Sequence, residues 1–233
     1  AHQSMHHLVA DSDWSHAALL GAVAREVVPV LSEGGEARCF WIVDDTGYRK
    51  YGSHSVGVAR QYCGQLGKTE NCQVAVTLSL ATAEGSLPLA YRLYLPREWT
   101  DDRKRCERAG VPKHIAFATK GELAWEQIEA ALAADIPLGT VLMDAGYGDE
   151  AALRDRLSAH GLTYAVGIKS GTTVWWGEHQ PAPAVKHTHG RPRSRVRRDA
   201  QHQPLSVCEL AHTLPVASYR TVSWRQGTNA TLR

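Results

Sequence analysis

The sequence predicts an α/β fold, in which one mixed β-sheet carries helices on both faces. Three observations support this prediction. Two β-branched, alternating segments in the first hundred residues have the pattern of a hairpin. After residue 119, segments with helical and strand periodicity alternate, as they do in βαβ units. After Lys169, Pro, His and Arg replace most large apolar residues, so regular structure is expected to end near that point.

The elements of the first half follow in order. Residues 14–28 have apolar side chains at helical spacing and predict a helix, and residues 41–43 predict a buried strand that ends at Asp44. Residues 45–71 are rich in Gly and Ser and are predicted as a long polar connection. Residues 72–82 and 87–96, on either side of a short turn, predict the hairpin.

The second half alternates helices and strands. A helix is predicted over residues 119–134, a buried strand over 139–144, a second helix over 148–161 and a last strand over 163–169. Three strands followed by helix, strand, helix and strand is the order of the ribonuclease-H-like fold, and we therefore assign residues 1–170 to such a core. Residues 177–204 are predicted as a loop or a disordered segment, and residues 219–227 as a small strand.

Composition narrows the class of protein. The chain has 233 residues, 43% hydrophobic and 21% charged, with a net charge of +2, which is ordinary for a globular domain. No apolar run is long enough to span a membrane. Five cysteines without a Cys-x-x-Cys pair indicate reduced thiols and a cytoplasmic location. The first residues have neither an initiator Met nor a signal peptide, so we expect the chain to begin partway through a longer protein.

Two similar segments, "WIVDDTGY" and "VLMDAGYGD", place carboxylates directly after apolar strands, at Asp44 and Asp144. In open α/β sheets, ligands collect outside the carboxyl ends of strands. Carboxylates that converge there repel each other unless a cation lies between them, and Mg²⁺ prefers such oxygen ligands. An Asp in this position can also simply cap the next helix or make a turn, and both interpretations stay open at this point.

A resemblance to a known family is carried by the block "WIVDDTGYRKYGSHSVGVARQYCGQLGKTENCQVAVTLSLAT", by "LPLAYRLYLPREW" and by "VLMDAGYGD". These segments resemble the bacterial insertion-sequence DDE transposases, in the branch whose DDE superfamily endonuclease domain carries a β-rich insertion before its last catalytic helix. The resemblance extends over about residues 3–227. It implies a ribonuclease-H-like core that cuts and rejoins DNA, using two Mg²⁺ ions held by Asp, Asp and Glu, with Mn²⁺ as a substitute.

The resemblance assigns roles to particular residues. Asp44 and Thr46 match the Asp-x-Thr pattern of the first catalytic acid, and Asp144 matches the second, so both Asp residues are the expected catalytic and metal-binding residues. Asp45, on the opposite side of the strand from Asp44, and Thr46 are expected to support them. The family's third acid lies in a block of the form Tyr-x-x-Arg-x-x-x-Glu, whereas Tyr219 is followed directly by Arg220 and no acid follows Glu209.

The missing block leads to the expectation that the chain is truncated before the catalytic Glu. Residues 171–233 would then be part of an incomplete β-rich, partly disordered insertion, and strand cleavage and transfer would be impaired in this chain alone. A transposase remnant that binds DNA without cutting it is the alternative. An Asp-nucleophile phosphatase is a weaker alternative, because such enzymes need a second Asp where this sequence has Thr46.

Basic residues give the candidate DNA contacts. Arg forks pair well with phosphate oxygens, and five arginines are expected to bind the DNA backbone: Arg191, Arg193, Arg195, Arg197 and Arg198. Four basic residues after Asp44 face either the substrate or solvent: Arg49, Lys50, Arg60 and Lys68. The expected partners are transposon ends and target DNA within the bacterial nucleoid, and a homodimer is left open.

Overall fold

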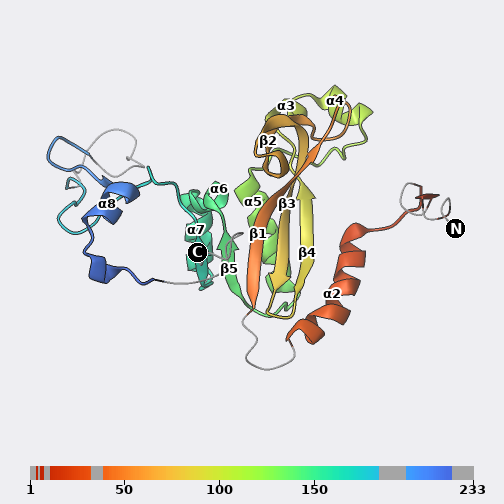
Figure 1. Ribbon diagram of the computed structural model, residues 1–233. Coiled ribbons are helices and arrows are strands. Elements are labelled where there is room, and N and C mark those ends of the chain that lie inside the picture. The colour runs from red at the N-terminus through yellow and green to blue at the C-terminus, as the bar shows by residue number, and fades with distance from the viewer. Residues whose placement is uncertain (1–3, 5, 8–10, 33–38, 184–197, 222–233) are drawn as a thin grey trace, which may run out of the picture. The chain divides into compact units, whose positions relative to one another are not determined.

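The computed structural model describes residues 4, 6–7, 11–32, 39–183 and 198–221. Its contacts divide the chain into two compact units, residues 1–168 and 169–233. The first unit holds a six-stranded mixed sheet with helices packed on it, which confirms the predicted α/β fold (Figure 1). That the residues after 170 form an inserted segment remains a prediction.

The sheet of the first unit combines antiparallel and parallel pairing around strand β1. The strands are β1 (Phe40–Arg49), β2 (Ala59–Cys63), β3 (Lys68–Ala81), β4 (Ser86–Leu93), β5 (Thr140–Met143) and β6 (Tyr164–Val166). Their order is β2-β3-β1-β5-β6, with β4 also paired to β3. β1 pairs antiparallel with β3 and parallel with β5, and β5 pairs parallel with β6. The parallel pairing brings the carboxyl ends of β5 and β6 to the same edge, beside the middle of β1.

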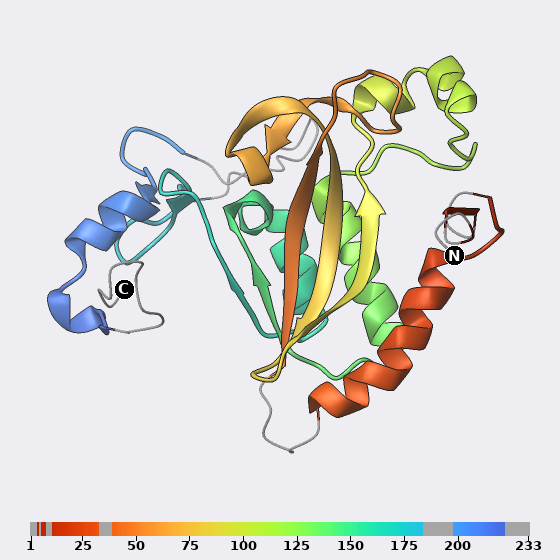
Figure 2. The same ribbon diagram turned by 45° about the vertical axis from the view of Figure 1, so that its right-hand side comes forward.

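Three helices pack on this sheet, as Figure 2 shows from a second direction. α2 (His16–Ser32) contacts β4, α5 (Lys120–Ala133) contacts β3 and β4, and α7 (Ala151–Ala159) contacts α5. α5 begins at a capping box in which Thr119 and Glu122 each bond the other's backbone N–H, which satisfies two N–H groups of its first turn. The side chains between sheet and helices form the main core and are almost fully buried: Trp41, Leu78, Leu80, Ile128, Val141 and Leu157.

The polar connection predicted over residues 45–71 is right only for residues 50–58, which have neither helix nor strand. The predicted end of the strand at Asp44 is wrong. β1 continues to Arg49, because β3 offers it a pairing partner at every position up to Cys72. β2 and the 3-10 turn η1 (Gly64–Leu66) follow, and they return close to β1. A Cβ at Gly47 would lie 2.8 Å from Cys63 Sγ, so a residue that looks like a strand breaker is what lets these segments approach. Long-range pairing here overrides weak local propensity.

Short helices that the sequence did not predict join the larger elements. α3 (Arg97–Thr100) and α4 (Arg103–Arg108) follow β4, and α6 (Ala145–Gly148) follows β5. α3 and α4 contribute Trp99 and Cys106 to a small second core together with Val58 and Leu95. This core anchors the loop that joins β1 to β2.

The second unit is small. It contains β7 (Thr173–Val174) paired antiparallel with β8 (Leu205–Ser206), then α8 (Val207–Thr213) and the 3-10 turn η2 (Val216–Ser218). Residues 177–183 and 198–204 have neither helix nor strand, in agreement with the loop predicted there. Most of the strand predicted over residues 219–227 lies outside the described residues. Within the described ranges, no helix is both long and apolar enough to cross a bilayer.

Candidate functional site

Strand register brings Asp44 and Asp144 together although 100 positions separate them. β1 and β5 pair in parallel from Phe40 opposite Thr140 to Val43 opposite Met143. Asp44 and Asp144 are the next residues along the two strands, directly after the last parallel pair, so they lie side by side. The antiparallel partner of Asp44 is Thr77, whose Oγ1 donates to the Asp44 carbonyl at 3.0 Å.

Both carboxylates lie on the side of the sheet away from the main core. Val43 and Met143, directly before them, are 2% and 7% exposed and belong to that core. Because successive side chains of a strand point to opposite sides, Asp44 points away from the core, and Asp144, just past the end of β5, is exposed as well. Thr46 is also exposed and shares the side of Asp44.

Each carboxylate uses one oxygen for a local backbone contact. Oδ1 of Asp44 accepts from the N–H of Asp45 at 2.7 Å, and Oδ1 of Asp144 accepts from the N–H of Gly146 at 2.8 Å, which makes Asp144 the N-cap of α6. Among the described residues, Oδ2 of either side chain has no hydrogen bond or ion pair. The capping role considered from the sequence is therefore present at Asp144, and it still leaves one oxygen of each carboxylate for another ligand.

Asp45 points to the opposite side of β1 and joins three elements. Its Oδ2 forms an ion pair with Lys120 Nζ at the start of α5, and its Oδ1 accepts a hydrogen bond from the Tyr147 hydroxyl of α6. Lys120 Nζ also lies 5.7 Å from the centre of the Tyr94 ring. The Asp45 side chain is 28% exposed and that of Lys120 33%, so the pair is only partly shielded from water.

The pKa of the Tyr147 hydroxyl is raised by burial and by the nearby carboxylates. Burial raises this pKa far above the ordinary value, and the hydrogen bond to Asp45 and then the charges of Asp45, Asp44 and Asp144 raise it further. The hydroxyl therefore stays protonated and remains a donor. Tyr147 is 3% exposed, so water screens these charges little.

Glycine allows the turn after Asp144 to pack tightly. A Cβ at Gly148 would lie 1.9 Å from the carbonyl oxygen of Gly167, directly after β6. No side chain fits there, and the absence of one lets α6 lie against the end of β6. The position of Asp144 is thus held by its own cap, by the Tyr147 hydroxyl and by this close backbone contact.

Asp44 and Asp144 lie at adjacent strand positions above the contacts of Asp45 with Tyr147 and Lys120, and they form a candidate metal site on a mixed sheet. A family model described as "DDE superfamily endonuclease" matches residues 1–231, almost the whole chain. The chain belongs to the DDE superfamily endonucleases. It is also similar to the "Probable transposase for insertion sequence element IS701" of Microchaete diplosiphon, with 29% identity over 212 residues. That match covers 89% of this chain and 50% of the relative, so the chain spans about half the length of the curated transposase it matches.

Membership of the family implies a divalent metal ion but does not say which residues bind it. DDE superfamily endonucleases depend on divalent metal ions, and Asp44 and Asp144 have the hard oxygen atoms that such ions prefer. In the part of the chain that the structure describes, no three His, Cys, Asp or Glu side chains are grouped as ligands for one ion. Asp44 and Asp144 thus form a pair there, without a third ligand of these types beside them.

The predicted DNA-binding arginines are only partly visible in this DDE domain. Arg191, Arg193, Arg195 and Arg197 lie outside the described residues. Arg198 is described, and its Nη2 donates to Thr173 Oγ1 of β7 at 3.0 Å. Sequence reasoning missed Lys120 altogether. Tyr147 was visible in the sequence only as part of a repeated Gly-Tyr pair, with no sign of its contact with Asp45.

Proposed function

We propose that Asp44 and Asp144 hold divalent metal ions with which this domain cuts and rejoins DNA at the ends of a transposon. The observation that carries the proposal is the parallel register of β1 and β5, which sets the two carboxylates side by side on the exposed side of the sheet. Its support from relatives is the match to the DDE endonuclease family and to a probable transposase.

The donor atoms fit Mg²⁺, which binds through one or two carboxylates and otherwise retains water. When bound, a pair of such ions supplies an activated water and stabilises the leaving oxygen in phosphodiester cleavage. The chain's own contribution is to hold the two carboxylates close together at fixed positions. Asp45, Lys120 and Tyr147 do this from the core side, because they join β1, α5 and α6 beneath the pair.

DNA partners follow from the same proposal. Transposon ends and target DNA would approach the exposed side of β1, and Arg191, Arg193, Arg195, Arg197 and Arg198 would bind the phosphate backbone. Mn²⁺ would replace Mg²⁺. Action on DNA in the bacterial nucleoid and assembly as a homodimer are further parts of this proposal, and they rest on the family resemblance.

Metal binding is the direct test. Isothermal titration with Mn²⁺ should show binding to the wild-type chain, and both Asp44→Asn and Asp144→Asn should weaken it at least tenfold, because each removes one charged ligand. Glu84→Gln, at an exposed acid in the β3–β4 turn, is the matched control and should bind as the wild type does. Unchanged binding in either Asp variant would refute the shared site.

A second function, DNA binding without cleavage, is favoured by the pair of carboxylates without a grouped third ligand among the described residues. A nicking assay on supercoiled plasmid separates the two. Nicking that needs Mn²⁺ and disappears in Asp144→Asn supports the endonuclease. DNA binding without any nicking, by a chain that still binds Mn²⁺, supports the second function.

A further inference from the structure

Three tyrosines at one end of the sheet are strongly exposed. Tyr48 at the end of β1 is 51% exposed, Tyr51 in the following loop 88%, and Tyr62 in β2 61%. An aromatic side chain left in water gives up the stabilisation that burial of its large apolar area would bring. Several such rings on two strands that both pair with β3, and on the loop between them, therefore indicate a surface that binds something flat and apolar.

Strand pairing places two of these rings on the same side of the sheet as Asp44. Tyr48 lies opposite Gln73 of β3, and Tyr62 lies opposite Thr69. Directly opposed residues point to the same side, and residues two or four apart on a strand share a side. Since Gln73 and Thr69 are four apart, and Asp44 and Tyr48 are four apart, the three side chains emerge on one side of the sheet.

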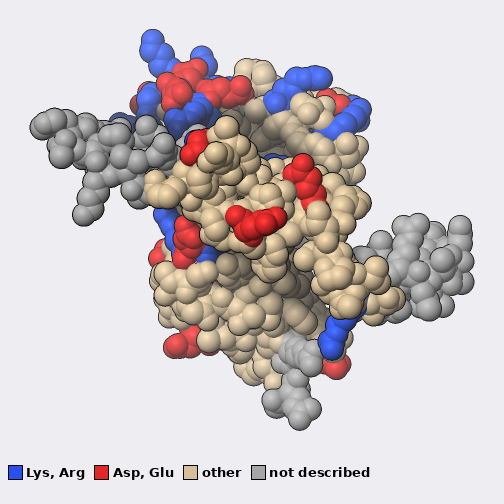
Figure 3. All heavy atoms as spheres, turned by 90° about the vertical axis from the view of Figure 1, so that its left-hand side faces the viewer, with Lys and Arg blue, Asp and Glu red and all other residues tan. Residues whose placement is uncertain are grey.

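Positive charge accompanies the rings. Arg60, opposite Asn71, projects on the side of Tyr62 and is exposed. Arg49 directly follows Tyr48 on β1, so its side chain starts on the opposite side of the strand, where its guanidinium lies 4.7 Å from the centre of the Tyr51 ring. That pair is therefore not part of the surface that carries Tyr48 and Tyr62. Figure 3 shows Lys and Arg side chains gathered at the end of the molecule where Figure 1 places β2, α3 and α4, with some acids among them.

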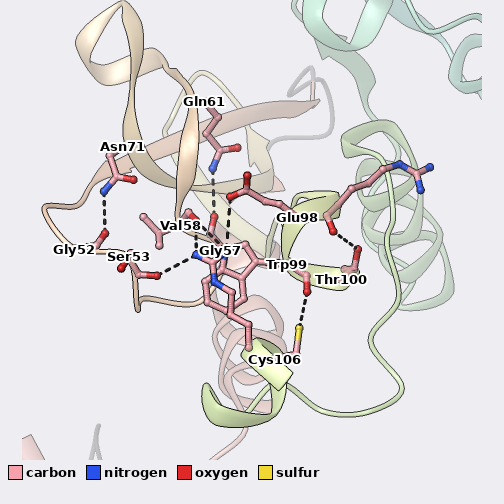
Figure 4. A network of polar contacts seen from close by, with 12 residues as sticks. Gly52, Ser53, Gly57, Val58, Gln61, Asn71, Glu98, Trp99, Thr100 and Cys106 are labelled. Carbon is pink, nitrogen blue, oxygen red and sulfur yellow. Dashed lines mark hydrogen bonds and ion pairs between the residues drawn. The ribbon is translucent and has the colours of Figure 1, made fainter. Parts of the chain in front are cut away.

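The loop that carries Tyr51 is held in place by a network of polar contacts (Figure 4). Asn71 Nδ2 donates to the carbonyls of Lys50 and Gly52, each at 2.9 Å. Trp99 Nε1 donates to the Val58 carbonyl at 2.8 Å, and Arg105 Nη2 donates to the Ser53 carbonyl at 3.0 Å. Asn71 belongs to β3, and Val58 directly precedes β2, so these contacts also fix the strands beside Arg60 and Tyr62. A fixed surface binds a ligand without a large loss of conformational entropy.

We propose that the ribbon surface, defined as Tyr48, Arg60 and Tyr62, binds an unpaired DNA strand next to the candidate metal site. Base faces stack on exposed aromatic rings, and arginine supplies backbone contacts and cation–π contacts. Tyr48 lies four positions after Asp44 on β1, which is about 13 Å, or roughly two nucleotides. The position of the strand relative to the cut rests on the proposed function, whereas its binding to the ribbon surface does not.

An unpaired strand fits this surface better than a duplex does. The base faces of a duplex are covered by their neighbours in the stack, so exposed rings on a surface can gain from stacking only if bases are unstacked. Arginines alone would bind duplex phosphates as readily. The tyrosines are therefore the part of the surface that distinguishes the two forms of DNA.

The test measures binding of fluorescent oligothymidylate and of a duplex of equal length by anisotropy, in EDTA, so that metal ions play no part. Tyr48→Ala and Tyr62→Ala should each weaken single-strand binding about fivefold or more, and duplex binding less. Tyr48→Phe and Tyr62→Phe keep the ring face and should stay within about twofold of the wild type. Tyr219→Ala removes a 52% exposed ring in the second unit and is the control.

Single-strand binding that is unchanged in both Ala variants would overturn the proposal, and so would equal losses on single strand and duplex. Phe variants that fall as far as the Ala variants would also overturn it, because the ring face would then not be the binding group. The outcome is separable from the metal site. If Asp44→Asn and Asp144→Asn leave Mn²⁺ binding unchanged while the Tyr variants lose single-strand affinity, the proposed function fails and the ribbon surface stands.

Discussion

The hydroxyl of Tyr147 donates a hydrogen bond to the carboxylate of Asp45, and these two residues are 102 positions apart in the chain. The contact joins the helical turn that begins at Asp144 to the strand residue that follows Asp44. Lys120 binds the other oxygen of the same carboxylate. Asp45, whose side chain points to the core side of β1, thus links the strand that carries Asp44 to the turn that carries Asp144.

Tyr147→Phe should separate this coupling from packing, because it removes the hydroxyl and keeps the ring in the core. We expect the free energy of unfolding to fall by about 1–2 kcal/mol, since the bond is to a charged acceptor. We also expect Mn²⁺ affinity to fall severalfold, because the turn that carries Asp144 loses one of its ties. Denaturant unfolding and isothermal titration measure the two effects.

Tyr164→Phe is the matched control for that experiment. Its hydroxyl lies 3.1 Å from Ser158 Oγ, away from the carboxylates, so the same chemical change should leave Mn²⁺ affinity at the wild-type value. An equal loss of Mn²⁺ affinity in both variants would show that general destabilisation, and not the bond to Asp45, governs the site.

Local pattern explains why several elements could be predicted well from the sequence. The helix expected over residues 119–134 corresponds to α5 (Lys120–Ala133), because apolar spacing and the Thr119–Glu122 capping box are both local signals. The strand expected over residues 72–82 corresponds to most of β3. The length of β1 could not be predicted, because Asp44, Asp45 and Gly47 have low strand propensity and are held by pairing with β3.

In the candidate site, too, some residues could be predicted from local sequence and others could not. An apolar strand followed by an acid, Gly and Tyr marks Asp44 and Asp144 in the sequence, and both lie where the parallel strands lead them. The Lys120 and Tyr147 contacts of Asp45 depend on how α5 and α6 dock on the sheet, which no short-range pattern encodes. Strand alternation did indicate that Asp45 faces away from Asp44.

Gly148→Ala tests whether close backbone packing fixes Asp144. Its Cβ would meet the Gly167 carbonyl oxygen at 1.9 Å, and backbone there can yield only by displacing α6 or β6. We expect a loss of about 2–3 kcal/mol in unfolding free energy and weaker Mn²⁺ binding. Gly64→Ala, where a Cβ meets nothing within 4 Å, is the control and should change neither quantity measurably. A Gly148→Ala variant as stable as the control would contradict the packing argument.

The buried thiol of Cys72 should make stability depend on alkaline pH. Burial raises its pKa from 9.0 to about 11, and the neighbouring Cys63 adds to the shift. Above pH 9 the unfolded chain loses this proton while the folded chain keeps it, so the unfolding free energy should fall as pH rises from 9 to 11. The share from Cys72 is about 1–2 kcal/mol.

Other groups also titrate above pH 9, so the contribution of Cys72 must be measured by comparing variants with the wild type. Cys72→Ala should lose less stability between pH 9 and pH 11 than the wild type loses, when both are followed by urea unfolding. Cys208→Ala, at an exposed cysteine, should show the wild-type dependence. Identical pH curves for wild type and Cys72→Ala would show that the thiol is not held in its neutral form.

The arginine-rich segment should contribute phosphate contacts that respond to salt. Each phosphate neutralised on duplex DNA adds about −0.9 to the slope of log affinity against log salt concentration. Replacing Arg191, Arg193, Arg195 and Arg197 with Gln should therefore make the slope shallower by up to about 3–4, while the same four changes to Lys should largely preserve it. Arg198 is left in place because it bonds Thr173 of β7. Anisotropy titrations at several salt concentrations measure the slopes, and a slope that is the same in the wild type and the Gln variant would show that this segment does not touch the DNA backbone.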